Sequence, residues 1–213
     1  MILQSLNSYY QRLEQDPAVD IAPFGFSRQQ IAFCVTVNLN GSLHAIDDIR
    51  ERDGKKPVSR SLVVLGNAKP SGSGINPGFL WDNPAYMLGY KTDDEKPERT
   101  RESFKAFHKR HLDAEAAVND PEFSAVCRFL ENWNPAEAAQ HPSLVEISTG
   151  FGVFRIRAAD HYVHEQKAVR QWWQQQITVA EDGATSTIGQ CLVTGQVGPL
   201  ARLHEPKIKG VWG

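Results

Sequence analysis

Residues 69–83, KPSGSGINPGFLWDN, contain the side chains of this sequence that are best suited to hydrogen bonding with a flat or charged partner. The alternating small residues of this stretch are Ser71, Gly72, Ser73 and Gly74. Glycine lacks a Cβ atom, so the backbone can approach a partner closely while the serine hydroxyls and the Asn76 amide form hydrogen bonds. The pattern predicts either a recognition loop or an ordinary surface connection, since clusters of Gly, Ser and Pro also join elements.

Two segments concentrate positive charge, although the formal net charge of the chain is −2. Residues 50–60 hold five Lys and Arg side chains against two acidic ones, and residues 99–111 hold five against one. A nearly neutral protein can carry a basic face that binds phosphates, but charged runs are also often simply solvated. The candidate phosphate contacts are Lys55, Lys56, Arg60 and Lys69.

Histidines occur in two pairs with i, i+3 spacing, His108 with His111 and His161 with His164. A histidine beside a lysine could act as an acid or base in cleaving RNA or DNA, and His108, His111 and His164 are the candidates for that alternative. No cysteine or acidic residue stands at a familiar ligand spacing from either pair, so metal binding is not expected. The common phosphate-loop, dinucleotide-binding and hydrolase motifs are absent from the sequence, so neither catalysis nor a cofactor is expected.

Length and composition indicate a globular protein with a real core. The sequence has 213 residues, of which 41% are hydrophobic, enough for one large domain or one and a half. It contains no run of 18 apolar residues and no basic segment followed by a cleavage site, which predicts neither a membrane span nor a signal peptide. Cys34, Cys127 and Cys191 are far apart among apolar neighbours, a pattern typical of reduced core thiols. A cytoplasmic location is therefore expected.

The hydrophobic periodicity predicts an α+β fold, with a mixed or antiparallel sheet flanked by several helices. The clearest element is a hairpin from Ile31 to Ile49, with apolar residues at alternate positions and a two-residue turn at Asn40-Gly41. Residues 61–65, SLVVL, predict a third strand that leads directly into residues 69–76, which we call the glycine-serine loop. The loop would then hang from the edge of a rigid sheet.

The remaining segments predict helices and two further strands. Residues 1–15 predict an amphipathic helix whose apolar stripe packs on the sheet, and residues 104–112 predict a second helix. Asp120-Pro121 would cap a third helix, whose buried face would hold Phe123, Val126, Cys127 and Leu130. Strands are predicted at residues 153–156 and 190–194, with a helix at residues 165–176 between them. The chain ends at KIKGVWG without a cap, a polar tail or a terminal helix, which suggests a fragment of a longer protein.

Six separated blocks of the sequence resemble one known family. They are MILQSLNSYYQRL, PFGFSRQQIAFCV, DIRERDGKKPVSRSLVVL, SGSGINPGFLWDNPAYMLG, RFLENW and CLVTGQVGPLARLHEPKIKGV. Together they resemble the N-terminal region of the large subunit of the type I-C CRISPR surveillance complex, Cascade. The resemblance covers essentially all of residues 1–213 and implies one N-terminal domain, followed in the family by a C-terminal helical region that is absent here.

This resemblance implies recognition without catalysis, in the service of antiviral defence. The family's N-terminal domain binds target duplex DNA, recognises a short protospacer-adjacent motif (PAM) and helps to start R-loop formation. In RNA-guided systems base pairing reads the target, while the protein reads only the short motif and the backbone. The implied partners are the guide RNA, the other Cascade subunits, a helicase-nuclease recruited to the complex and a phage-encoded anti-CRISPR inhibitor.

The PAM-reading loop of the family matches the glycine-serine loop. The resemblance therefore assigns DNA recognition to Lys69, Ser71, Gly72, Ser73, Gly74 and Asn76. Some family members carry asparagine between the two glycines and lysine two residues after the second, where this chain has Ser73 and Asn76. A serine hydroxyl has a single donor and can contact either type of base.

Two interpretations besides DNA recognition stay open on sequence grounds. One is the histidine-based nuclease or RNA-processing enzyme, and the other is an assembly module that binds only guide RNA or neighbouring subunits. Three aromatic residues are either candidate wedges or stacking platforms at a melted base step or ordinary core residues, namely Phe24, Phe26 and Phe79.

Overall fold

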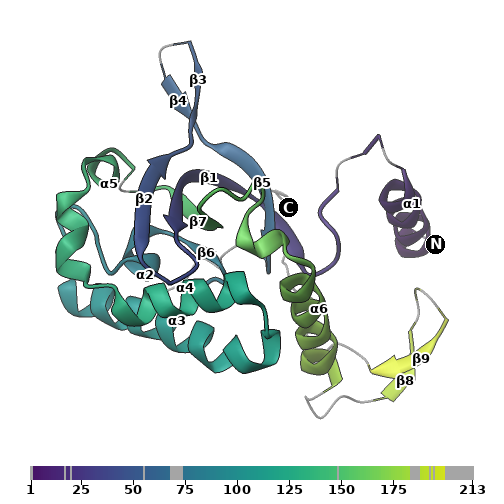
Figure 1. Cartoon of the computed structure of the whole chain (residues 1–213). Coiled ribbons are helices and arrows are strands. Elements are labelled where there is room, and N and C mark those ends of the chain that lie inside the picture. Colours follow the sequence, from purple (N-terminus) through teal and green to yellow (C-terminus); the bar gives the residue numbers. More distant parts are fainter. Residues whose placement is uncertain are drawn as a thin grey trace.

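The computed structural model confirms the α+β class (Figure 1). It describes residues 2–16, 18–19, 21–54, 56–67, 74–147, 149–182, 188–191, 193 and 195–199. Several predicted contact residues lie outside these ranges, namely Lys55, Lys69, Ser71, Gly72 and Ser73. The basic C-terminal segment KIKGVWG also lies outside them.

A five-stranded mixed sheet forms the centre of the fold. Its strands are β1 (Phe26–Val37), β2 (Leu43–Asp48), β5 (Arg60–Leu65), β6 (Trp81–Asp82) and β7 (Phe151–Ile156). The long strand β1 pairs antiparallel with β2 and β5 on one edge and parallel with β7 on the other, and β6 pairs antiparallel with β7. The predicted hairpin and third strand are therefore confirmed, and so is a strand across residues 153–156.

Strands β2 and β5 follow one another along the same edge of β1. Asp48, at the end of β2, pairs with Phe33, and Arg60, at the start of β5, pairs with Ile31. The chain between them forms β3 (Glu51–Asp53) and β4 (Lys56–Val58), an antiparallel pair that projects from the body (Figure 1). We call residues 51–58 the basic hairpin. Its Asp53-Gly54 turn has φ of +63° at Gly54, the conformation that glycine adopts without a Cβ penalty.

Helices cover one face of the sheet. They are α2 (Pro84–Met87), α3 (Pro97–Val118), α4 (Pro121–Asn132), α5 (Pro142–Glu146) and α6 (Lys167–Asp182), with short 3-10 turns at Pro135–Gln140 and Val163–Glu165. Asp120 caps α4 by accepting the backbone N–H groups of Glu122 and Phe123, as predicted. The four apolar residues predicted for the buried face of α4 are all buried. A further strand pair, β8 (Ile188–Gln190) and β9 (Val197–Pro199), lies beyond α6.

The main core lies between the sheet and these helices. Phe33, Val35 and Val37 of β1 belong to it, together with Phe107 of α3 and Phe129 of α4. Ile31 was predicted to share their face, but it lies in a second cluster with Cys34, Val64, Trp81 and Val153. The pairing with β7 is irregular between Ile31 and Phe33. Such an irregularity changes which face the following side chains occupy, so the strict alternation fails at this point.

Three other sequence predictions are corrected by the structure. Helix α1 (Ile2–Gln15) forms, but none of its residues is buried, so its apolar stripe does not pack on the sheet. The link between β1 and β2 is a five-residue loop, residues 38–42, in which Asn38 N–H donates to the Ser42 carbonyl, and not a two-residue turn. The predicted strand at residues 190–194 is instead β8, which ends at Gln190. In the part of the chain that the structure describes, no helix is long and apolar enough to cross a membrane.

Candidate nucleic-acid interface

The two ends of the segment that holds the glycine-serine loop are joined to each other. Trp81 Nε1 donates a hydrogen bond of 2.6 Å to the carbonyl of Leu65, the last residue of β5. The next residue, Gly66, donates its N–H to the Gly25 carbonyl, which also accepts the indole N–H of Trp173 in α6. Residues 66–81 therefore leave and re-enter the fold close together, at one end of β5.

Helix α3 holds the described part of this segment through three side chains. Arg99 Nη2 donates to the Gly74 carbonyl at 3.2 Å, and Arg110 Nη1 donates to the Pro77 carbonyl. His111 Nε2 accepts the N–H of Leu80 at 2.9 Å. These three bonds, spread over three turns of the helix, fix the path of residues 74–80.

His111 is neutral and is part of this support. Its Nδ1 lies 2.7 Å from the Phe107 carbonyl, so this nitrogen carries the proton while Nε2 accepts from Leu80. The ring stacks on Phe79 with centroids 4.9 Å apart. Complete burial lowers its pKa to about 3, against the smaller opposing effect of the Phe107 carbonyl. The position of His111 explains why Leu80 can hold an unusual φ of 62°.

Arg110, next to His111, also packs against residues of the core. The Arg110 guanidinium lies 5.8 Å from the ring centroid of Phe79 and 5.5 Å from that of Trp173. Burial lowers its pKa from the usual value. Phe79 and Phe26 are core residues, whereas the Phe24 side chain is 66% exposed. Of the three aromatic candidates, Phe24 alone is on the surface.

Asn76 and Gly74 lie at the end of the glycine-serine loop that the structure describes. The Asn76 N–H donates to the Tyr86 hydroxyl at 3.2 Å, which ties this position to α2. A Cβ atom at Gly74 would lie 3.2 Å from Asn76 Nδ2. Gly74 does not adopt a positive φ. The small size of Gly74 therefore leaves room for the Asn76 amide, and backbone conformation is not the reason for glycine here.

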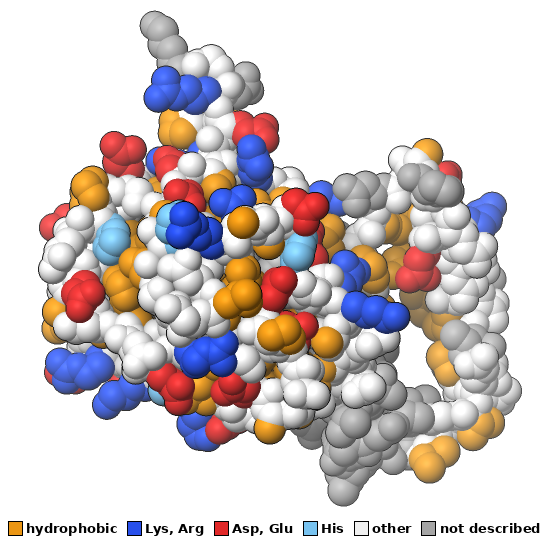
Figure 2. Space-filling view, viewed as in Figure 1, with side chains coloured by type: hydrophobic (Ala, Val, Ile, Leu, Met, Phe, Trp, Pro, Cys, Tyr) orange, Lys and Arg blue, Asp and Glu red, His pale blue; other side chains and the backbone are white. Residues whose placement is uncertain are grey.

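The basic hairpin lies at the opposite end of β5. Lys56 is exposed at its tip, and Figure 2 shows Lys and Arg side chains along this projection. Arg60, at the base, forms an ion pair of 3.2 Å with Glu51, and its side chain is 46% exposed. Arg60 and Leu65 are the first and last of the six residues of β5, so they lie roughly 17 Å apart at 3.3–3.4 Å per residue.

The second basic segment contributes less free charge than its sequence indicates. Most of its cations have partners, namely Arg99 with the Gly74 carbonyl, Arg101 with Glu98, Lys109 with Asp113 and Arg110 with the Pro77 carbonyl. Within residues 99–111, all of which the structure describes, Lys105 is the one cation without such a bond. Of the cations predicted to form a basic face, two therefore bind backbone carbonyls and two form surface ion pairs, which leaves little unpaired positive charge.

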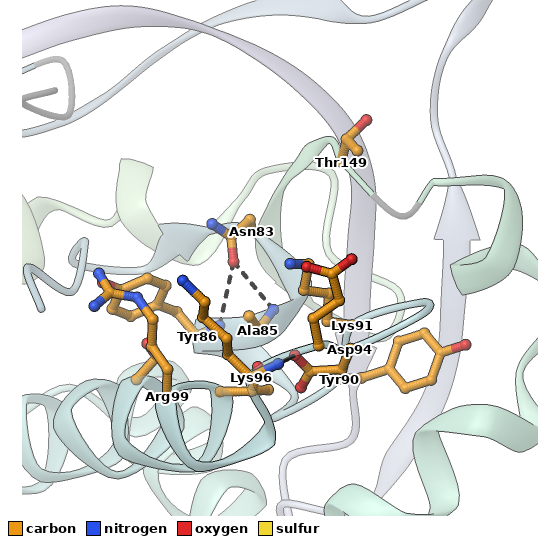
Figure 3. A pocket seen from close by; sticks show the side chains of 12 residues that line it. Asn83, Ala85, Tyr86, Tyr90, Lys91, Asp94, Lys96, Arg99 and Thr149 are labelled. Atoms are coloured by element: carbon orange, nitrogen blue, oxygen red, sulfur yellow. Dashed lines mark hydrogen bonds between the residues drawn. The ribbon is translucent and has the colours of Figure 1, made fainter. Parts of the chain in front are cut away.

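A pocket of about 540 Å³ lies between α2 and the start of α3 (Figure 3). It borders the described end of the glycine-serine loop. Three cationic side chains line it, Lys91, Lys96 and Arg99, together with Asp94 and Glu95. Figure 3 shows Lys96 and Arg99 rising from the beginning of α3 toward Tyr86 and Asn83. Tyr86 and Arg99 are also the two residues that bind the backbone of Asn76 and Gly74.

A comparison with protein-family models decides the family. Residues 6–213 match the model described as CRISPR-associated protein (Cas_Csd1). The chain belongs to this family. A comparison with curated proteins finds no match. The CRISPR association implied by the sequence resemblance is thereby confirmed, while the assignment to one subunit and the reading of a motif stay predictions.

The histidines of the second pair, His161 and His164, lie in contrasting environments. His164 is buried, and this burial lowers its pKa to about 4, against a smaller opposing effect of the nearby Val63 carbonyl. Neither ring nitrogen forms a hydrogen bond within the described residues. His161 lies instead between Asp160 and Glu122, each 3.0 Å away, which raise its pKa. No group of three or more possible metal ligands occurs among the described residues.

Sequence reasoning missed the residues of the Csd1-family chain that position the loop. Arg99 was counted as part of a basic run and Tyr86 was not considered, yet both bind the loop backbone. No local signal marks them, because each contact joins segments that are 10 to 25 residues apart. The basic hairpin did carry a signal, the Asp53-Gly54 dipeptide, which favours a tight turn between strands.

Proposed function

We propose that this chain is the N-terminal domain of the large subunit of type I-C Cascade, and that it binds target duplex DNA and recognises the PAM. It is a non-catalytic domain that helps to start R-loop formation in antiviral defence. Its partners are the guide RNA, other Cascade subunits and the recruited helicase-nuclease, and a phage-encoded anti-CRISPR inhibitor could target it. Family membership supports the CRISPR role, and the anchored loop supports the recognition role.

The observation that carries the proposal is the anchoring of residues 74–80, which include the described end of the glycine-serine loop. Sequence discrimination needs a hydrogen-bonding group held in one place, since each good base contact contributes ~1–3 kcal/mol only in the correct geometry. Residues 74–80 are fixed to α3 at three points, and Trp81 ties their end to β5. A simple surface connection would not need this support.

The distance between the loop and the basic hairpin fits a duplex. Arg60, at the base of the hairpin, lies roughly 17 Å along β5 from Leu65, where the segment that holds the loop leaves the sheet, and the hairpin projects further outward. One full turn of B-DNA is about 34–36 Å long, so the two features could contact sites half a helical turn or more apart on one duplex. Lys56, with Arg60 at the base, would bind phosphates and set the register, while the loop reads bases.

The burial of His111 and His164 weighs against the enzyme alternative. A general acid or base must reach its substrate and must have a pKa near the working pH. His111 and His164 are buried, and their pKa values are lowered to about 3 and about 4. His111 also holds the loop, so a loss of activity in a His111 variant would not by itself indicate chemistry.

The test is motif-dependent DNA binding by the full complex with the guide held constant. We expect Asn76→Ala and Gly74→Val to lower the ratio of affinities for matched and mismatched motifs, with thermal stability nearly unchanged. Gly74→Val should act by displacing the Asn76 amide, which lies 3.2 Å from a Cβ at that position. Val58→Ala, at an exposed apolar position in the basic hairpin, is the control and should keep the wild-type ratio.

Two results would decide for the alternatives. Equal affinity of the wild-type complex for every motif would favour an assembly module that binds only guide RNA or other subunits. Cleavage of RNA or DNA by the chain, abolished by a single change at His108 or His164 in a variant that still folds, would favour the enzyme.

A further inference from the structure

The pocket between α2 and the start of α3 shares two residues with the support of the loop. Arg99 binds the Gly74 carbonyl and Tyr86 binds the Asn76 N–H, and both side chains line the pocket. A strand of nucleic acid that contacts the loop at Asn76 would therefore reach the pocket within one or two nucleotides. The position of the pocket makes it a continuation of the predicted interface.

Most of the donor capacity of the three pocket cations is not used by the protein. Lys91 and Lys96 form no ion pair within the described residues, and Arg99 gives one hydrogen bond to a neutral carbonyl. The Asp94 carboxylate accepts hydrogen bonds from the Thr100 hydroxyl and the Lys96 backbone N–H. These two bonds lower its pKa more than the charge of Lys91 does. Asp94 is thus stabilised mainly by groups at the start of α3 and less by the lysine side chains.

Size and charge define the ligand. A pocket of about 540 Å³ is within the usual range of ~300–1,000 Å³ for small-molecule sites, and is too small for a duplex. Three cations and two carboxylates line it, which suits a ligand with a single negative charge. A phosphodiester group carries one negative charge, whereas a nucleoside triphosphate would bring several charges against Asp94 and Glu95.

We propose that this pocket binds one phosphodiester group of a single-stranded segment of nucleic acid adjoining the PAM-reading loop. Lys91 and Lys96 contact its charged oxygens, and Arg99 contributes its remaining N–H groups. The inference rests on the proposed function in placing a strand beside the loop. The same chemistry could come from either DNA strand or from the guide RNA, and the experiment separates these sources.

The test is a scan with uncharged linkages on the assembled complex. Methylphosphonates replace single phosphates in turn, in the target strand and the displaced strand beside the motif and in the guide RNA. Binding is measured for the wild type and for a Lys91→Gln, Lys96→Gln double variant. In the wild type, one or two adjacent positions should lower the affinity by up to roughly tenfold at 0.1 M salt. In the double variant, methylphosphonates at the same positions should cause no further loss of affinity. The strand that carries these positions identifies the nucleic acid that occupies the pocket.

Two controls make the result specific. Lys105→Gln removes an exposed cation from the same helix outside the pocket, and it should keep the full loss at those positions. Glu95→Gln removes a carboxylate from the pocket and should raise the affinity for the unmodified strand.

The proposal is overturned if every linkage has the same effect in the wild type and in the double variant. That outcome leaves motif recognition intact, because the ratio for matched and mismatched motifs is measured on the same complexes. Conversely, a linkage whose effect disappears in the double variant, in a complex that shows no motif preference, would support the pocket and contradict PAM recognition.

Discussion

The N–H of Leu80 is held by Nε2 of His111, 2.9 Å away, although 31 residues separate the two in the sequence. The same ring donates its one N–H proton, on Nδ1, to the Phe107 carbonyl, so both nitrogens are engaged in a fully buried site. A single neutral histidine thus connects the C-terminal half of α3 to the segment that follows the glycine-serine loop. Protonation of the ring would destroy the acceptor and place a charge in the core.

The stability of the protein should fall as the pH is lowered from about 6.5 toward 3. An unfolded histidine binds a proton below about 6.5, whereas His111 and His164 do so only near 3 and 4 in the fold. The unfolded chain therefore binds more protons in this window, and the full stability is present above it. Each pH unit is worth about 1.4 kcal/mol per proton. Denaturant titrations at several pH values would measure the slope.

His111→Phe should reduce this pH dependence by about one proton and lower the free energy of unfolding at pH 7. The phenyl ring can stack on Phe79 but leaves the Leu80 N–H without an acceptor, a cost of ~1–3 kcal/mol. His108→Phe, one turn earlier at a half-buried position without such a bond, is the matched control. Retention of the wild-type pH slope in His111→Phe would show that the ring is not neutral in the fold.

Arg99→Gln should weaken motif discrimination while leaving stability almost unchanged. The side chain is exposed, so the change in stability should stay within about 0.5 kcal/mol. The Gly74 carbonyl would lose its donor, and the adjoining loop would become less well positioned. The readout is the ratio of affinities for matched and mismatched motifs, which a uniform loss of phosphate binding in the pocket does not alter. Arg101→Gln, two residues on and paired with Glu98, should keep the wild-type ratio.

Replacing Lys56 and Arg52 of the basic hairpin with alanine should weaken DNA binding for all sequences alike. The slope of log affinity against log salt should decrease in magnitude by about one for each lost phosphate contact. Arg60→Ala should have a smaller effect, because Glu51 already pairs with it. A titration of duplex binding by the full complex at several salt concentrations gives the slope. An unchanged slope in the double variant would remove the hairpin from the interface.

The three cysteines should differ in reactivity in the native protein. Burial raises the pKa of the Cys34 thiol to about 11 and that of Cys127 to about 12, so neither forms the reactive thiolate at neutral pH. Cys191 is partly exposed and should react first with a thiol reagent. All three should react after unfolding, and elemental analysis should find no zinc. Stoichiometric zinc would reopen the metal interpretation of the histidine pairs.

The parts of the fold that the sequence predicted are those encoded by neighbouring residues. The cap of α4 depends on Asp120 and the two residues after Pro121, and the β1–β2 hairpin depends on an alternating pattern around one loop. Errors arose where a distant segment decides. Ile31 faces the second cluster because of an irregular pairing with Phe151, 120 residues further along the chain. For α1, the periodicity correctly indicated two faces but not whether anything covers the apolar one.

For the candidate site, composition drew attention to the glycine-serine loop and to the basic segment at residues 50–60, and their role in recognition stays a prediction. Composition misassigned Arg99, Arg110 and His111, whose roles depend on the approach of α3 to a loop about 30 residues earlier. A charged or titratable residue on a helix looks the same in sequence whether it faces solvent or supports a loop.

The basic hairpin is an insertion within a single line of pairing along β1. Asp48 pairs with Phe33 and Arg60 with Ile31, and the Ile49 N–H bonds to the Ala32 carbonyl between them. The ladder is therefore continuous on both sides of the point where the hairpin leaves. In evolutionary terms this makes the hairpin a module, free to lengthen, shorten or exchange its charges without altering the sheet. Under the proposed function, the reach along DNA can then differ between relatives while Leu65 and Trp81, at the far end of β5, keep their bond.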